Sequence, residues 1–179
     1  VLCKQVPNHP PAIALHIGAL LRLQRYEQGV RLARRSLRHI THKPHRVAII
    51  TQFSDGLTQS GALTEAIEMV GLELERQPDN TPLIACYTHL LVMNDQHDEA
   101  IACIDAARAR GIESPSIAAV FGRAVLRTER RDEAIAWLQT ILGDESHDGG
   151  GNAQRHRAFN ALGHLLDKAG RYDEAMEAF

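Results

Sequence analysis

The chain has 179 residues, 44% of them hydrophobic and 23% charged, and its 20 Lys and Arg against 22 Asp and Glu give a formal net charge of −2. This composition is typical of a folded globular protein and excludes a disordered chain, a collagen-like chain and a chain that is basic overall. No apolar run approaches the ~18 residues needed to cross a bilayer. The three cysteines, Cys3, Cys86 and Cys103, form no CxxC pair, which favours reduced thiols and a cytoplasmic protein.

The first predicted unit, residues 10–45, contains two apolar stretches at helical spacing and carries much of the basic charge. Residues 1–46 hold nine Lys or Arg and one acid, Glu27, a local charge of +8. Four arginines follow helical spacing on one exposed side, which we call the basic face: Arg31, Arg34, Arg35 and Arg38. Such a face could bind phosphate, an anionic surface or an acidic partner segment. A solvated outer helix, or one packed on an upstream repeat, is favoured because Tyr26 is the only aromatic residue before Phe53, and nucleic acid is therefore not the expected partner.

The next three units, residues 47–80, 81–114 and 115–148, have equal lengths and repeat one pattern at a constant step. An alanine recurs at this step, and an aromatic residue followed by a small one stands thirteen residues before each alanine. The alanines are Ala66, Ala100 and Ala134, and the aromatic residues are Phe53, Tyr87 and Phe121. A truncated unit at 156–179 follows after seven extra residues in a Gly-rich acidic stretch, residues 143–152, which predicts an enlarged loop. We therefore predict five units, the first of them loose.

Each unit predicts a pair of helices joined by a short polar turn. The apolar residues follow the helical period, and none alternates over a strand length. An Asp or Thr opens each second helix, where it is expected to cap free N–H groups beside a Glu at the positive end of the helix dipole. Because one pair cannot bury its apolar side alone, the pairs must stack on one another. The sequence therefore predicts an all-α solenoid.

The pattern resembles the tetratricopeptide repeat (TPR) family, whose 34-residue units combine a large-x2-Leu-Gly-x2-Tyr first helix with an Ala-x3-Phe second helix. The best copy contains Leu162, Gly163, Tyr172, Ala175 and Phe179. The resemblance covers essentially the whole chain and implies a right-handed superhelix whose first helices line a concave groove. It also implies a noncatalytic scaffold for a protein or peptide partner. The last copy is similar to the repeats that precede bacterial sulfotransferase domains, so an accessory module of a larger enzyme is the alternative.

The resemblance places the outward positions of the first helices in this groove. Counted from the buried columns, the candidates for ligand contact form a mixed polar set, which we call the groove ladder: Asp55, His89, Arg123, Asn160 and His164. One variant of the family clamps the C-terminal carboxylate of a partner with Lys and Asn at such positions, and the groove ladder does not match it. The alternative is that the ladder residues are only solvated.

Motifs for catalysis, cofactors and metals are missing from the sequence. It has no Gly-rich phosphate loop, no GxSxG elbow and no HExxH helix, so we expect neither an enzyme nor a bound cofactor. His39, His42 and His45 recur every three residues. However, Pro44 is expected to break the helix before His45, and no acid nearby completes a set of ligands. We therefore expect no metal site.

The two ends of the chain predict a fragment of a longer protein. The chain starts at Val1 without methionine and stops at Phe179 within a predicted helix. Phe159, Leu162 and Leu166 belong to the truncated unit, so the apolar side that a following helix would cover is expected to face water. Exposed apolar surface of this kind tends to find a partner, and we predict self-association through the C-terminal end.

Overall fold

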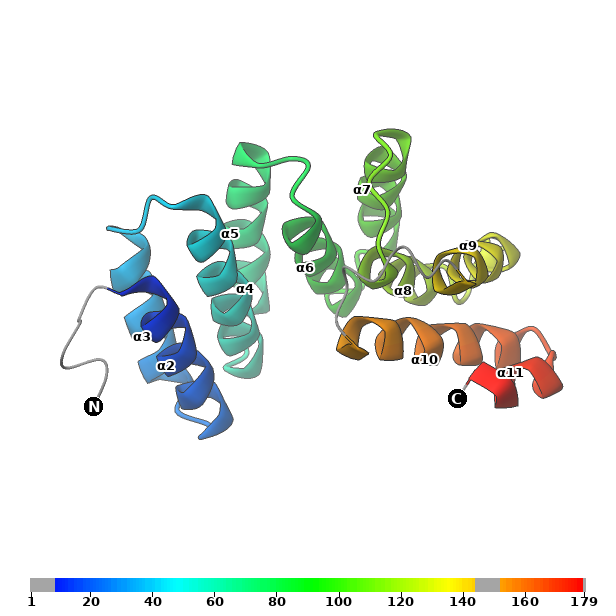
Figure 1. The fold of residues 1–179 in the computed structure, drawn as a ribbon, viewed down its shortest axis with the longest axis horizontal. Helices are drawn as coiled ribbons and strands as arrows, with labels where there is room; N and C mark the ends of the chain where they lie inside the picture. Colours follow the sequence, from blue (N-terminus) through cyan, green and yellow to red (C-terminus); the bar gives the residue numbers. More distant parts are fainter. Residues whose placement is uncertain (1–8, 144–151, 179) are drawn as a thin grey trace. The chain divides into compact units, whose positions relative to one another are not determined.

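The computed structural model describes residues 9–143 and 152–178, and every regular element in these ranges is an α-helix (Figure 1). The helices follow one another as pairs, each with a first and a second helix. Two pairs lie in a first compact unit, Val1–Pro78, and three pairs lie in a second, Asp79–Phe179. The predicted all-α architecture with sequential helix pairs is confirmed.

The first unit contains four helices: α2 (Pro10–Arg22), α3 (Tyr26–Leu37), α4 (Lys43–Gln59) and α5 (Leu63–Arg76). Helix α4 packs against the other three and so forms the centre of this unit. Ile17, Ile49 and Val70 are fully buried there. Gly56 of α4 allows a close approach of α2, because a Cβ atom at this position would lie 2.8 Å from the Leu21 side chain.

A partly buried ion pair connects three helices of the first unit. The Arg46 Nε donates to both carboxylate oxygens of Glu73, at 3.0 and 2.9 Å. Its Nη1 donates to the carbonyl oxygens of Leu37 and Ile40 near the end of α3, at 2.8 and 3.2 Å. The Gln77 amide also donates to Glu73, whose side chain is only 4% exposed. Part of the basic surplus of residues 1–46 is therefore neutralised inside the unit.

The second unit contains six helices: α6 (Thr81–Met93), α7 (His97–Ala109), α8 (Pro115–Ala124), α9 (Arg131–Gly143), α10 (Asn152–Lys168) and α11 (Tyr172–Ala178). Helix α8 packs against α6, α7, α9 and α10, and eight of its ten residues are buried. A Cβ atom at Gly122 would lie 2.8 Å from the Leu165 side chain and 3.3 Å from that of Leu138. The small residue predicted after each aromatic therefore admits a neighbouring helix here, while Arg123 is the one exposed residue of α8.

Helices α6 and α8 begin with a side-chain cap followed by proline. The Asn80 side chain accepts a hydrogen bond from the Leu83 N–H at 3.1 Å, and Ser114 accepts one from the Ile117 N–H at 3.2 Å. No side chain caps the N-termini of the second helices α3, α5 and α7. The prediction of Asp and Thr caps is wrong for these helices, because their start is set by the turn that precedes them.

Pro44 starts a helix and does not end one. It lies in the first turn of α4. Backbone N–H groups in a first turn have no acceptor within the helix, so proline loses no hydrogen bond there, and its fixed φ suits a helix. Helix α3 has already ended at Leu37, so the prediction that Pro44 breaks a helix before His45 is wrong. Helices α4 and α10 begin at Lys43 and Asn152, four residues before the predicted units at 47 and 156.

The turns between the first and second helices of four pairs contain one residue with left-handed backbone. Its φ is +57° at Gln24, +82° at Gly61, +57° at Asp95 and +76° at Gly170. Glycine adopts this conformation without strain, whereas a residue with a Cβ atom loses about 1 kcal/mol. The second helices therefore start where a left-handed residue reverses the chain.

The structure of the two units does not test several predictions about the whole array. The right-handed superhelix and the single continuous array stay predictions, as do the unit boundaries. The predicted enlarged loop falls largely on residues 144–151, which lie outside the described ranges, as Cys3 does. None of the helices from α2 to α11 is both long enough and apolar enough to cross a bilayer.

Candidate functional site

The residues of the groove ladder lie on first helices in both units. Asp55 lies on α4 of the first unit, His89 on α6, Arg123 on α8, and Asn160 and His164 on α10. His89 is half-buried, and the other four residues are exposed. Because α8 packs against both α6 and α10, the second unit holds its ladder residues on neighbouring helices.

The structure brings two of the ladder residues into direct contact. The Arg123 Nη2 lies 2.7 Å from the His89 Nδ1. A guanidinium can only donate, so the Nδ1 atom accepts, and His89 is neutral with its proton on Nε2. Burial, followed by the charges of Arg123 and Arg157, lowers the pKa of His89 to about 4. His89 is therefore a neutral acceptor at neutral pH.

Arg157 of α10 completes this group, although it is not among the predicted ladder residues. Burial lowers the pKa of Arg123, and the Arg157 charge lowers it in addition. The Arg157 charge also lowers the pKa of His89, and Arg157 lies on α10, which packs against α8. We call these three residues the groove cluster: His89, Arg123 and Arg157. His89, Arg123 and Arg157 are separated by the same 34 residues. The sequence prediction added the seven inserted residues to the last step and therefore chose His164 in place of Arg157.

The groove cluster carries two positive charges that the described residues leave unbalanced. No carboxylate within residues 9–143 and 152–178 pairs with Arg123 or Arg157. The His89 ring holds Arg123 through one N–H, which leaves other guanidinium N–H groups for a ligand. An anionic or hydrogen-bond-accepting group is the chemistry that this arrangement can receive. The roles of Asp55, Asn160 and His164 as ligand contacts stay predictions.

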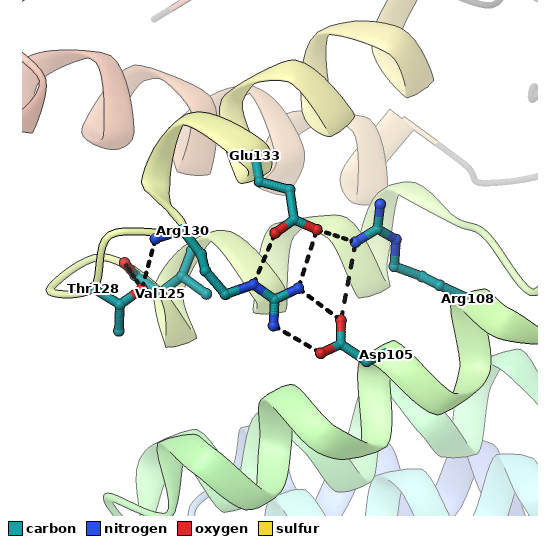
Figure 2. A network of polar contacts seen from close by, with 6 residues as sticks. All are labelled: Asp105, Arg108, Val125, Thr128, Arg130 and Glu133. Atoms are coloured by element: carbon teal, nitrogen blue, oxygen red, sulfur yellow. Dashed lines mark hydrogen bonds and ion pairs between the residues drawn. The ribbon is translucent and has the colours of Figure 1, made fainter.

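A second polar network of the same unit has a structural role (Figure 2). The Arg130 guanidinium donates to both oxygens of Asp105, at 2.7 and 2.9 Å, and to both oxygens of Glu133, at 2.8 and 3.0 Å. Arg108 donates to Glu133 at 2.6 Å. The network joins α7 to the start of α9, and the hydrogen bond from Arg130 is the first cause that lowers the pKa of Glu133 to about 2.

The arginines of this network also lie over two buried aromatic rings. Arg108 Cζ is 4.3 Å from the ring centroid of Trp137, and Arg130 Cζ is 4.9 Å from that of Phe121. The two rings meet edge to face at 5.5 Å. Phe121 is one of the predicted aromatic columns and is fully buried. Helix α8 therefore contributes Phe121 to a contact with Trp137 of α9 on one side and presents Arg123 on another.

The basic face lies on helix α3 and the residue that follows it, and all four arginines are exposed. Arg31 pairs with Glu27 at 3.0 Å, and Arg34 pairs with Glu65 at the start of α5. Two of the four positive charges are therefore balanced within the first unit. Binding of a polyanion by this face stays a prediction.

The histidines near Pro44 lie on two different segments. His39 follows α3, whereas His42 and His45 lie at the start of α4 with ring centroids 4.4 Å apart. In the described part of the chain no group of three or more His, Cys, Asp or Glu side chains is placed to hold a metal ion. Cys86 and Cys103 are half-buried and form no disulfide, and burial raises the pKa of Cys103.

Comparison with known proteins finds similarity at the level of structure. No family model matches the sequence, and no curated protein matches it. The structure is similar to a thermophilic TPR protein of Thermus thermophilus, with a TM-score of 0.71 and 17% identity, over 95% of this chain and 88% of that one. It is also similar to the nearly identical TPR-like repeats of a putative kinesin light chain of Podospora anserina, with a TM-score of 0.69 and 15% identity, over 96% of this chain and 92% of that one. A third similar structure is MamA of Desulfovibrio magneticus RS-1, with a TM-score of 0.61 and 16% identity, over 95% of this chain and 90% of that one.

Sequence identities as low as these show the fold alone. They give no support to a link with sulfotransferases, which stays a prediction from the last repeat. Three solved structures, which each match more than nine tenths of the chain, share its fold of sequential helix pairs. The chain has the fold of a TPR-like repeat protein.

Proposed function

We propose that this chain is a noncatalytic scaffold that binds a protein or peptide partner through the first helices of its second unit. The observation that carries the proposal is the groove cluster, to which the packed helices α6, α8 and α10 each supply one polar side chain, two of them in direct contact. TPR-like arrays present such surfaces for extended ligands because successive helices repeat at a fixed step. Three cysteines without a CxxC pair favour a cytoplasmic location over an oxidising compartment.

Photocrosslinking tests this surface directly. A benzophenone amino acid is placed at Asn160 on α10, which is exposed beside the groove cluster, and as a control at Gln139, which is exposed on the second helix α9. We expect Asn160 to capture a discrete partner from native lysate and Gln139 to capture none. The partner is identified by mass spectrometry.

Substitutions then decide whether the ladder carries the binding. Arg123→Glu and His89→Ala are both expected to weaken capture of that partner. Arg123 is exposed, so Arg123→Glu should leave the melting temperature nearly unchanged, because exposed substitutions shift stability by about ±0.5 kcal/mol. Undiminished capture by both variants, or equal crosslinking from Asn160 and Gln139, would exclude this surface as the binding site.

A further inference from the structure

The arginines of the second unit differ in how their charge is balanced. Arg108 and Arg130 share Asp105 and Glu133, and Arg171 pairs with Glu174. Arg131 and Arg155 donate to backbone carbonyl oxygens, at the end of α10 and near the end of α9. Arg123 instead donates to a neutral imidazole, and Arg157 makes no hydrogen bond within the described residues. In the described part of this unit, Arg123 and Arg157 thus lie on two helices that pack against each other, α8 and α10, and neither has a carboxylate partner.

The surroundings of the groove cluster make a counterion favourable. Arg123 is exposed as a residue, but its Nη2 lies 2.7 Å from the half-buried His89 ring, and desolvation of the guanidinium is the main cause that lowers the pKa of Arg123. A charge in partly dry surroundings gains more from an ionised acceptor than a fully hydrated one does. Arg157 repels Arg123, and one carboxylate between them would remove that repulsion. The two guanidinium groups therefore have N–H donors available for an anion, and no described carboxylate occupies them.

His89 gives the site a fixed orientation. Its Nδ1 accepts from Arg123 Nη2 at 2.7 Å, so the flexible arginine has one preferred direction before any ligand arrives. Ordering a long side chain in advance reduces the entropy that binding would otherwise lose. His89 is thus a positioning residue for Arg123.

We propose that Arg123 and Arg157 bind the carboxylate side chains of an acidic peptide segment, with His89 holding Arg123 in place. The inference rests on the proposed function and names the chemistry of the partner. An acidic peptide is favoured over nucleic acid because, among the aromatic side chains described in the second unit, only Tyr172 on α11 is a large exposed ring on which a base could stack. Charge complementarity selects the occupant.

A selection from a random library of short displayed peptides tests the proposal with the whole chain. Wild type is compared with the double variant Arg123→Gln, Arg157→Gln, and with Arg127→Gln, which removes an exposed arginine in the α8–α9 turn. Selected peptides are then synthesised with every Glu and Asp in place, or replaced by Gln and Asn, and binding is measured by fluorescence anisotropy.

We expect the wild type and Arg127→Gln to select peptides rich in Glu and Asp, and the double variant to lose them. Each single arginine change should weaken binding about tenfold, as should replacing the acids by amides. His89→Asn keeps an acceptor near the same place and should retain affinity, whereas His89→Leu should lose affinity at a melting temperature no lower than that of His89→Asn.

The outcomes separate this inference from the proposed function. Selection of neutral or basic peptides that the double variant still binds would overturn the acidic ligand and leave a peptide groove standing. A wild type that selects no peptide would count against both. A single-stranded oligonucleotide that binds more tightly than the acidic peptide, and loses affinity in the double variant, would overturn the peptide assignment.

Discussion

Glu133→Gln is the substitution that best tests the network around Arg130. The change keeps the size of the side chain and an acceptor oxygen but removes the charge that pairs with Arg108 and Arg130. These two arginines keep Asp105 as a partner, so the unit should still fold. The expected loss of stability therefore reports on one charge in a network that joins α7 to α9.

The magnitude follows from the pKa of Glu133. Its lowering from 4.5 to about 2 corresponds to at most about 3 kcal/mol of favourable interaction with the ionised carboxylate. The Glu133 side chain is 38% exposed, and water screens an exposed pair strongly, so we expect a loss of about 1 kcal/mol at pH 7. Because the folded pKa is the lower one, this contribution is complete above the unfolded pKa of 4.5 and is lost as pH falls toward 2.

Urea unfolding followed by tryptophan fluorescence measures this loss. Trp137 is the only tryptophan of the sequence and lies beneath Arg108, so the signal reports on the second unit alone. Glu99→Gln is the matched control, since Glu99 holds the position equivalent to Glu133 in the preceding repeat and accepts only from the Gln96 amide. Equal unfolding free energies for the two variants at pH 7, or a gap that persists unchanged at pH 2, would refute the reasoning.

Three further changes test the backbone, the packing and the C-terminal end. Gly61→Ala should cost about 1 kcal/mol, because its φ is +82° and no atom crowds it, whereas Gly143→Ala in α9 should cost nothing measurable by denaturant unfolding. Ala100→Leu should lower the melting temperature by several degrees more than Ala102→Leu, since Ala100 is fully buried and Ala102 is exposed, and overpacking costs about 1–3 kcal/mol; equal melting curves would show a wrong register. Leu162 and Leu166 are only 6% and 1% exposed, so the prediction that their side of α10 faces water is wrong, because neighbouring helices cover it. Met176 on α11 is 75% exposed, so light scattering should show self-association that Met176→Lys reduces, and a wild type that stays monomeric at high concentration would contradict this.

The repeat period determined much of the fold from the sequence alone. Residues that recur at a constant step must occupy equivalent places, and their helical spacing excludes strands. Ala66, Ala100 and Ala134 are fully buried, and two of the three aromatic columns, Phe53 and Phe121, are buried as well. The pairing of helices and the residues at their crossings were therefore predictable. In each unit small residues let two helices approach closely, and large apolar residues fill the space between them.

Contacts between long polar side chains were decided only by the tertiary structure. An arginine reaches residues several turns away, so no fixed step predicts that Arg46 pairs with Glu73 or Arg130 with Asp105. The side chain that faces Arg123 on α10 is likewise set by how α8 and α10 cross, and the inserted residues before α10 hide that register from a repeat alignment. The sequence by itself determined which helices exist and which sides they bury, and the packing angles of those helices decided which charges meet.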